Sequence, residues 1–363
     1  MEKILTDNWA LDAIRQLFEK GLSNEEIYDL IIDEKTNSYS WNSLPFSGIQ
    51  LEVLISLLVE LVLSEKLLVA SGYESSRNIL PLLKLEAEGI IEPVNINWKD
   101  VDLLKKREYL LDQFCRVPAL KEVIEKNNEA YMRGEECYHP YLNIIIWGTA
   151  GYLIRSDEFH APYTGHPIRR RLIEKTRLLS PVYNAMEFYS QWLCKNRLHI
   201  YDNLSDFYQG VRLITLLPPI AIEIIESSKD ADDLIPTALQ MRDKYKSLRK
   251  WLSKLQNYIE VGDLNKLQSE REFLDSISNY LNKSSKESGF GTVYLNIGIG
   301  QIPIPVPDLK LRKHFGVRAI LNGQVFSKTG HSSIQRLVSM FDRKQSRCGK
   351  LALDYLNNKF ASS

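Results

Sequence analysis

The chain has 363 residues, 44% of them hydrophobic and 25% charged, a balance that excludes disordered and fibrous proteins and leaves room for two or three domains. The formal net charge is zero, but residues 1–100 hold 17 acidic and 8 basic side chains, whereas residues 308–363 hold 3 acidic and 11 basic ones. A basic C-terminal segment suits contact with a polyanion, or with an acidic surface of a partner or of the chain itself.

Cysteine usage and hydropathy indicate a cytoplasmic protein. Its four cysteines lie far apart without a C-x-x-C pair, which favours reduced thiols over a disulfide framework. The N-terminal residues lack the basic and apolar regions of a signal peptide, and the longest apolar runs are short or interrupted by polar side chains. We therefore expect no membrane segment.

The N-terminal residues 1–98 predict a small α/β unit. Ser23–Glu26 has the S-x-x-E form of a capping box and predicts a helix through about Asp33. Apolar residues on nearly every side of Ile49–Ser64 predict a buried helix. Lys66–Ser71 and Ile90–Val94 then read as short strands on either side of a helix over Ile79–Glu88.

Residues 99–282 predict a helical domain, in which Pro118, Pro140 and Pro167 each suit the first turn of a helix. The expected helices are Asp100–Phe114, Pro118–Arg133, Pro140–Ser156, Pro167–Leu178, Val182–Lys195, Asp206–Leu217, Ile235–Ile259 and Leu264–Leu281. The fold class that follows is mainly α-helical, with the α/β unit before this domain and residues 283–363 after it.

The C-terminal segment 283–363 begins with a strand pattern and continues as a basic helix. Apolar residues alternate over Val293–Val306, and the prolines of its second half exclude a helix and suit an edge strand, so we expect a β-hairpin. A helix then opens near Ile334 with Ser332 or Ser333 as N-cap. If it is continuous, it aligns four cations on one face; Cys348-Gly349 is the point where it could break. These cations are Arg336, Arg343, Arg347 and Lys350.

The stretch from Arg155 to Arg171 is the candidate site. Three cations fall in the first turn of the helix that begins at Pro167, where the helix dipole disfavours positive charge. Either ion pairs with Asp157 and Glu158 offset this cost, or an anionic ligand does. The predicted anion-binding residues here are Arg155, Arg169, Arg170 and Arg171, and the catalytic candidates are His160, Tyr163 and His166, which could transfer protons to or from a phosphodiester.

Two metal-dependent alternatives are set aside. Cys137, His139, His160 and His166 could in principle bind zinc, but their spacing matches no standard site. Glu74 and Glu92 are too few for a metal-dependent nuclease. We therefore predict no metal and no cofactor.

Three functions are compatible with these patterns. The favoured one is binding of a polyanion, above all nucleic acid, with metal-independent phosphodiester chemistry as an open addition. The alternative is a non-enzymatic adaptor whose basic tail docks on an acidic protein partner or on its own acidic N-terminal part. A third, resting on composition alone, is a small-molecule enzyme with a pocket around Trp147, Tyr152 and Trp192, aromatic residues that we expect to be core. No oligomeric state follows from the sequence.

Overall fold

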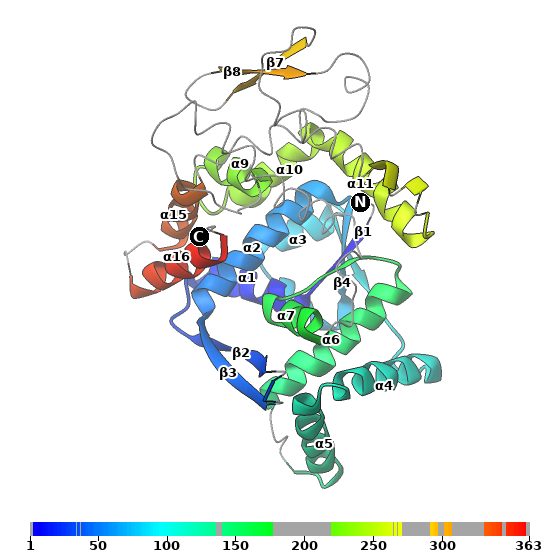
Figure 1. Cartoon of the computed structure of the whole chain (residues 1–363). Helices are drawn as coiled ribbons and strands as arrows, with labels where there is room; N and C mark the ends of the chain where they lie inside the picture. The colour runs from blue at the N-terminus through cyan, green and yellow to red at the C-terminus, as the bar shows by residue number, and fades with distance from the viewer. Residues whose placement is uncertain are drawn as a thin grey trace. The chain divides into compact units, whose positions relative to one another are not determined.

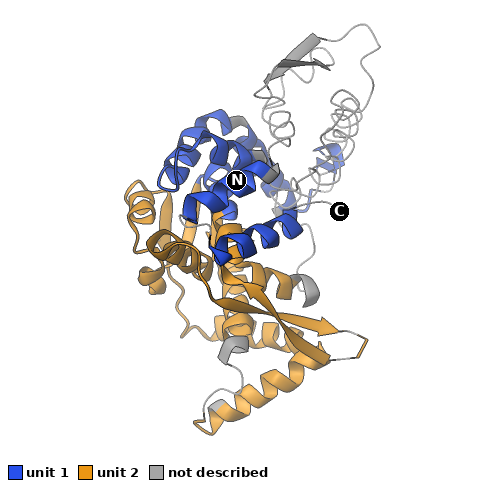
Figure 2. Ribbon diagram, turned by 90° about the vertical axis from the view of Figure 1, so that its left-hand side faces the viewer, with its two compact units in different colours: residues 1–2, 55–65, 182–363 blue, residues 3–54, 66–181 orange. Residues whose placement is uncertain are grey.

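The computed structural model describes residues 3–33, 35–36, 38–135, 140–176, 219–263, 265–266, 268–270, 291–296, 301–306, 330–342 and 346–360. The chain divides into two units (Figure 2): unit 1 comprises residues 1–2, 55–65 and 182–363, and unit 2 comprises residues 3–54 and 66–181. These units divide the chain differently from the three segments expected from the sequence. The fold class is as predicted: mainly helical, with a small α/β unit, a two-stranded hairpin and C-terminal helices (Figure 1).

Unit 2 is built around a parallel sheet of four short strands. Their order across the sheet is β5-β4-β1-β6, with every neighbouring pair parallel. The strands are β1 (Lys3–Thr6), β4 (Lys66–Ala70), β5 (Ile91–Val94) and β6 (Tyr163–Thr164). If the four strands are numbered along the chain, their order across the sheet is 3-2-1-4, which is the order at the centre of a doubly wound α/β sheet. The order reverses at β1.

The helices of unit 2 largely follow the sequence. They are α1 (Asn8–Lys20), α3 (Leu80–Ala87), α4 (Val101–Cys115), α5 (Pro118–Met132), α6 (Pro140–Glu158) and α7 (Pro167–Thr176), with a 3-10 segment, η1, at Ser71–Arg77. The predicted strand-helix-strand unit of β4, α3 and β5 is confirmed, and so are the three proline starts. Gly89 follows α3 with φ 69°, a conformation that glycine adopts without strain.

The helix predicted from Ser23 to Asp33 is wrong. Strand β2 (Glu26–Asp33) occupies this stretch and pairs antiparallel with β3 (Ser38–Pro45). The Ser23 hydroxyl accepts a hydrogen bond from the amide N–H of Glu25, so it caps a local turn rather than a helix. The β-branched and aromatic residues of β2 favour the strand once a partner strand is present.

Helix α2 (Phe46–Leu63) contributes to both units. Among the described residues it is the helix long and apolar enough to cross a membrane, but 94% of that window is buried within the protein, as expected of a core helix. Its C-terminal end lies in unit 1, where the guanidinium groups of Arg242 and Arg249 donate to the carbonyls of Leu61 and Val62. Cations at this end complement the helix dipole.

The other described helices belong to unit 1. They are α9 (Pro219–Ser227), α10 (Leu234–Lys244), α11 (Lys246–Glu260), α15 (Gly330–Phe341) and α16 (Arg347–Phe360). The single helix predicted over Ile235–Ile259 is instead two, because the chain leaves helical geometry at Tyr245, with φ −97° and ψ 10°. Tyr245 is fully buried, and its hydroxyl donates to the Glu223 carboxylate at 2.6 Å.

The predicted hairpin is present. Strand β7 (Gly291–Asn296) pairs antiparallel with β8 (Gln301–Val306), so that Tyr294 lies opposite Pro303 and Thr292 opposite Pro305. A two-stranded sheet leaves β8 with an edge that has no partner strand in the described part of the chain, which is where prolines are tolerated.

Candidate functional site

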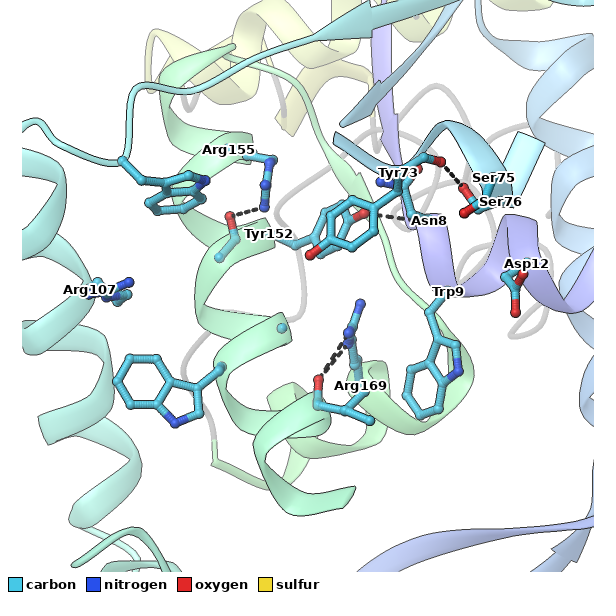
Figure 3. Close-up of a pocket in the computed structure, with 15 residues that line it drawn as sticks. Asn8, Trp9, Asp12, Tyr73, Ser75, Ser76, Arg107, Tyr152, Arg155 and Arg169 are labelled. Carbon is cyan, nitrogen blue, oxygen red and sulfur yellow. Dashed lines mark hydrogen bonds between the residues drawn. The ribbon is translucent and has the colours of Figure 1, made fainter. Parts of the chain in front are cut away.

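Unit 2 contains a cavity of about 630 Å³ at the carboxyl edge of the parallel sheet (Figure 3). A volume of a few hundred cubic ångströms is typical of pockets for small molecules. The lining residues are Asn8, Trp9, Asp12, Tyr73, Ser75, Ser76, Trp98, Arg107, Ile144, Trp147, Gly148, Gly151, Tyr152, Arg155 and Arg169.

The sheet topology explains why these residues meet. Asn8 and Trp9 directly follow β1, Tyr73 follows β4, and Trp98 follows β5. The carboxyl ends of parallel strands lie at one edge of a sheet, and a crevice opens there where the strand order reverses. The order reverses at β1, so the cavity occupies the position where doubly wound sheets bind their ligands.

Asp7, at the carboxyl end of β1, organises the floor of the site. Its side chain is fully buried and caps α1 by accepting from the amide N–H of Trp9 at 2.9 Å. It also accepts from the Tyr163 hydroxyl at 2.6 Å and from the His166 amide N–H at 3.1 Å. Burial acts to raise the pKa of Asp7, but the charge of Arg169 and these hydrogen bonds outweigh it and lower the pKa below its ordinary value.

Arg169, from the first turn of α7, completes this buried cluster. One of its terminal nitrogens lies 2.6 Å from a carboxylate oxygen of Asp7, and its other nitrogens donate to the carbonyl of Ile144 in α6. The predicted ion pairs with Asp157 and Glu158 are wrong, because both of those carboxylates pair with Lys106. The cation at the start of α7 is offset by Asp7 from the far end of the sequence.

Aromatic rings and guanidinium groups alternate along one side of the cavity. Arg155 lies over Trp98 at 4.9 Å and over Tyr152 at 5.1 Å, measured from the guanidinium carbon to the ring centroid. Arg169 lies over the same Tyr152 at 5.4 Å and over Trp9 at 5.0 Å. The result is a stack of five side chains, held by contacts between cations and aromatic faces.

Two of the cavity arginines have no ion-pair partner among the described residues. Arg107 lies over the ring of Trp147 at 5.2 Å, and Arg155 donates to the carbonyl of Gly151 at 3.2 Å, but neither pairs with a carboxylate of the described residues. The Nε atom of each is buried without a hydrogen-bond partner. Burial lowers the pKa of Arg155, yet a guanidinium stays protonated in proteins. The cavity therefore carries two cationic groups that form no ion pair with a carboxylate in the described part of the chain.

The acidic side chain of the cavity does not change this balance. Asp12 pairs with Arg15 at 2.7 Å and accepts from the Gln16 amide, so its charge is already offset on α1. A further polar group without a partner is the Oδ1 atom of Asn8, whose side chain is 4% exposed and whose Nδ2 donates to the carbonyl of Ala70. Among the described residues that line it, the cavity thus has two guanidinium groups without a carboxylate partner and one amide oxygen without a hydrogen-bond donor.

Two of the three catalytic candidates, His160 and Tyr163, have structural roles. His160 is exposed just past α6 and has φ 45°. Its backbone N–H donates to the carbonyl of Asp157, and the backbone N–H of Ala161 donates to the carbonyl of Ser156, which is the pattern of a Schellman C-cap. Tyr163 is held by Asp7, and burial raises the pKa of its hydroxyl well above the ordinary value. Neither belongs to the described residues that line the cavity.

His166, the third candidate, is completely buried and stacks on Trp9, with ring centroids 3.8 Å apart. Its Nδ1 atom accepts from the amide N–H of Ile168 at 3.4 Å, which makes it the N-terminal cap of α7. Burial lowers the pKa of His166 to about 3, and the charges of Arg169 and Arg171 act in the same direction against that of Asp7. The neutral ring is therefore the form that the fold requires.

This burial predicts a pH-dependent stability. An unfolded histidine has a pKa near 6.5, so below that pH the unfolded state takes up a proton that folded His166 excludes until about pH 3. Lowering the pH from 7.5 to 5.5 should cost about 1.4 kcal/mol of the free energy of unfolding through this group. Urea titrations of the wild type and His166→Asn check it, since asparagine keeps a capping acceptor but does not titrate. Equal pH slopes in both proteins would contradict the assignment.

The remaining predicted anion-binding residues of α7 point to different partners. Arg171 pairs with Asp29 of β2 at 2.7 Å. Arg170 is exposed and does not line the cavity. Of the four arginines predicted around this stretch, the structure brings Arg155 and Arg169 together at one site.

The C-terminal cations do not form the continuous stripe that one long helix would give. The helix ends at Phe341, and the carboxylate of Asp342 accepts from the amide N–H of Ser346 to start α16, with Cys348 and Gly349 buried inside that helix. Arg336 donates to the carbonyls of Ile225 and Ser228 and so caps α9. The remaining cations of the predicted stripe are Arg347 and Lys350, exposed on α16, and Arg343, which lies outside the described residues.

Several cavity residues were not predicted from the sequence. Asn8, Trp9 and Arg107 carry no local motif, and the stretch Lys3–Thr6 ahead of them has two apolar residues, too few to indicate a strand. Trp147 and Tyr152 were expected to be core. Tyr152 is, at 4% exposed within a core cluster, although it also borders the cavity, whereas Trp147 is partly exposed on the cavity wall. Trp192, Cys137 and His139 lie outside the described residues.

Comparisons with known proteins add no relative. No protein-family model, curated protein or solved structure matches this chain.

Proposed function

We propose that this protein binds a small phosphorylated ligand in the cavity of unit 2. The observation that carries the proposal is the pair Arg107 and Arg155, two guanidinium groups that face one cavity without a carboxylate partner among the described residues. A planar guanidinium presents its donors in a fork that matches the oxygens of a phosphate. A bound phosphate would supply the negative charge that these two groups lack.

The energetics favour an anionic ligand over a neutral one. A partly buried cation without a counter-ion has lost hydration and gained no Coulomb attraction in return. Arg155 is close to that position, since burial lowers its pKa despite the attraction of the more distant Asp7, and its guanidinium donates to the uncharged carbonyl of Gly151. An anion next to it recovers part of this cost, so binding free energy should concentrate on the phosphate.

The mode of phosphate binding differs from that of a glycine-rich dinucleotide fold. In those folds the phosphate sits on the open N-terminus of the helix that follows the first strand. Here Asp7 caps that helix, α1, and the amide N–H of Asn8 donates to the Tyr152 hydroxyl at 2.8 Å. The N–H groups of the first two helical residues are thus already satisfied by protein groups, and we expect the arginine side chains to hold the anion.

Binding of nucleic acid through the C-terminal cations stays a prediction. Arg336 is committed to capping α9, so any such surface would rest on fewer cations than the sequence suggested. The adaptor hypothesis gains weight if no phosphorylated compound binds unit 2.

The test is calorimetric titration of the full chain with ribose 5-phosphate and with inorganic pyrophosphate. Arg107→Gln and Arg155→Gln should each raise the Kd about tenfold, as expected for the loss of one charge-assisted contact worth about 1.4 kcal/mol. Lys105→Gln is the matched control, because Lys105 lies on the same helix as Arg107 but its side chain is 70% exposed and pairs with Asp102. No binding by the wild type, or equal losses in all three variants, would refute the proposal.

A further inference from the structure

We infer that the phosphorylated ligand is a nucleoside phosphate, whose base stacks on the aromatic side chains of the cavity and whose phosphate lies at Arg107 and Arg155. This inference rests on the proposed function and adds the chemical class of the ligand. Three groups on the cavity wall, independent of the two arginines' charge, carry it.

The first group is the aromatic lining. Besides the buried Tyr152, four large rings border the cavity, those of Trp9, Trp98, Trp147 and Tyr73. None is completely buried, and Tyr73 is 56% exposed. Contiguous exposed aromatic surface is unfavourable in water unless something covers it. A sugar phosphate or an aliphatic phosphate would leave the exposed ring of Tyr73 and the exposed parts of Trp98 and Trp147 wet, whereas a nucleobase would cover them.

The second group is the pair of arginines in their other role, as flat surfaces. Arg107 lies over the ring of Trp147, whereas the guanidinium of Arg155 already contacts two rings, those of Trp98 and Tyr152. A base can stack on a guanidinium plane as well as on an aromatic ring, so Arg107 is the arginine on which we expect the base to stack. Alternating planes of both kinds make a wall that suits one flat heterocycle next to its own phosphate.

The third group is Asn8. Its side chain is fixed, because Nδ2 donates to the carbonyl of Ala70 at 3.1 Å and the backbone N–H donates to Tyr152. Asn8 lines the cavity, and its Oδ1 atom is a buried acceptor without a hydrogen-bond partner. A buried polar group of this kind is costly until it is satisfied. An exocyclic amine of a base or a ribose hydroxyl is a donor that would satisfy it.

The size of the cavity and the cap on α1 limit the ligand to one nucleotide. A volume of about 630 Å³ suits one drug-sized molecule. A dinucleotide in its usual position would need the N-terminus of α1, and Asp7 occupies that position. We therefore expect a mononucleotide unit, either as a free nucleotide or as the end of a single strand.

The experiment measures the four common nucleoside monophosphates against ribose 5-phosphate, by calorimetry and by quenching of tryptophan fluorescence. At least one nucleotide should bind about tenfold more tightly than ribose 5-phosphate, the effect expected of one stacked base. Tyr73→Ala should remove most of that advantage and leave the affinity for ribose 5-phosphate unchanged. Tyr109→Ala is the matched control, since Tyr109 is 62% exposed on α4 and does not line the cavity.

The outcomes separate this inference from the proposed function. If ribose 5-phosphate binds and depends on Arg107 and Arg155, but no nucleotide binds more tightly, the inference is wrong and the proposed function stands. If no phosphorylated compound binds, both fail. A 5′-phosphorylated single strand is the last arm: tighter binding than the mononucleotide identifies a strand end as the source, and weaker binding identifies the free nucleotide.

Discussion

Asp7→Ala is expected to lower the free energy of unfolding by about 3–5 kcal/mol, the usual cost of removing one partner of a buried ion pair. The substitution leaves the Arg169 guanidinium, whose side chain is 8% exposed, without its carboxylate. It also removes the cap of α1 and leaves the Tyr163 hydroxyl and the His166 amide N–H without an acceptor. Urea unfolding followed by circular dichroism measures the loss.

Three variants show which part of Asp7 matters. Asp7→Asn keeps an acceptor for the cap and the hydroxyl but removes the charge, so it should fall between the wild type and Asp7→Ala. The double variant Asp7→Asn/Arg169→Met should recover part of the stability, because no uncompensated charge is left buried. Asp12→Ala on the same helix is the control: its pair with Arg15 is partly exposed and should cost at most about 1 kcal/mol. A loss in Asp7→Ala no larger than this control would contradict the role of Asp7.

The regular elements were predictable because their signals are local. Proline starts and apolar periodicity located α5, α6 and α7, and the strand-helix-strand unit at Lys66–Val94 could be read from neighbouring residues. Ser23–Glu26 shows the limit of such motifs, since the same S-x-x-E pattern starts a turn when the following residues pair as a strand. Tertiary pairing then outweighs a local cap.

Strands β1 and β6 were not predictable, and the site depends on them. They hold four and two residues, too few for any periodicity, and they are strands because β1 pairs with β4 and β6 pairs with β1. Without β1 the sequence gives no reason to place Asn8 and Trp9 at the edge of a sheet. The order of the strands, and therefore the crevice, follows from pairing between distant segments.

The partner of Arg169 was not predictable for the same reason, because it lies far away in the sequence. The sequence correctly marks a cation at the start of α7 as needing compensation, but it favoured the neighbouring carboxylates at Asp157 and Glu158. The actual partner, Asp7, is 162 residues away. Local charge patterns therefore identified the residue that matters without identifying what it does, which is to tie α7 to the end of β1.

Gly148→Ala is expected to destabilise unit 2 by about 3 kcal/mol or more, although alanine is the better helix former by about 1 kcal/mol. A Cβ atom at Gly148 in α6 would lie 2.1 Å from a terminal nitrogen of Arg169. The guanidinium would have to move away from Asp7 and from the carbonyl of Ile144, which separates a buried ion pair. Urea unfolding measures the change in the free energy of unfolding.

Gly151→Ala is the matched control, since Gly151 lies about one turn further along α6. A Cβ atom there would lie 3.3 Å from a terminal nitrogen of Arg155, at the flexible end of that side chain. It should be neutral or stabilising, as helix propensity alone predicts. In an Arg169→Ala background the clash at Gly148 disappears, and Gly148→Ala should then resemble Gly151→Ala. If Gly148→Ala is equally harmful with and without Arg169, the small residue is needed for some other contact and the clash does not explain its cost. A cost that vanishes with Arg169 shows that α6 keeps a glycine there so that the arginine can reach Asp7.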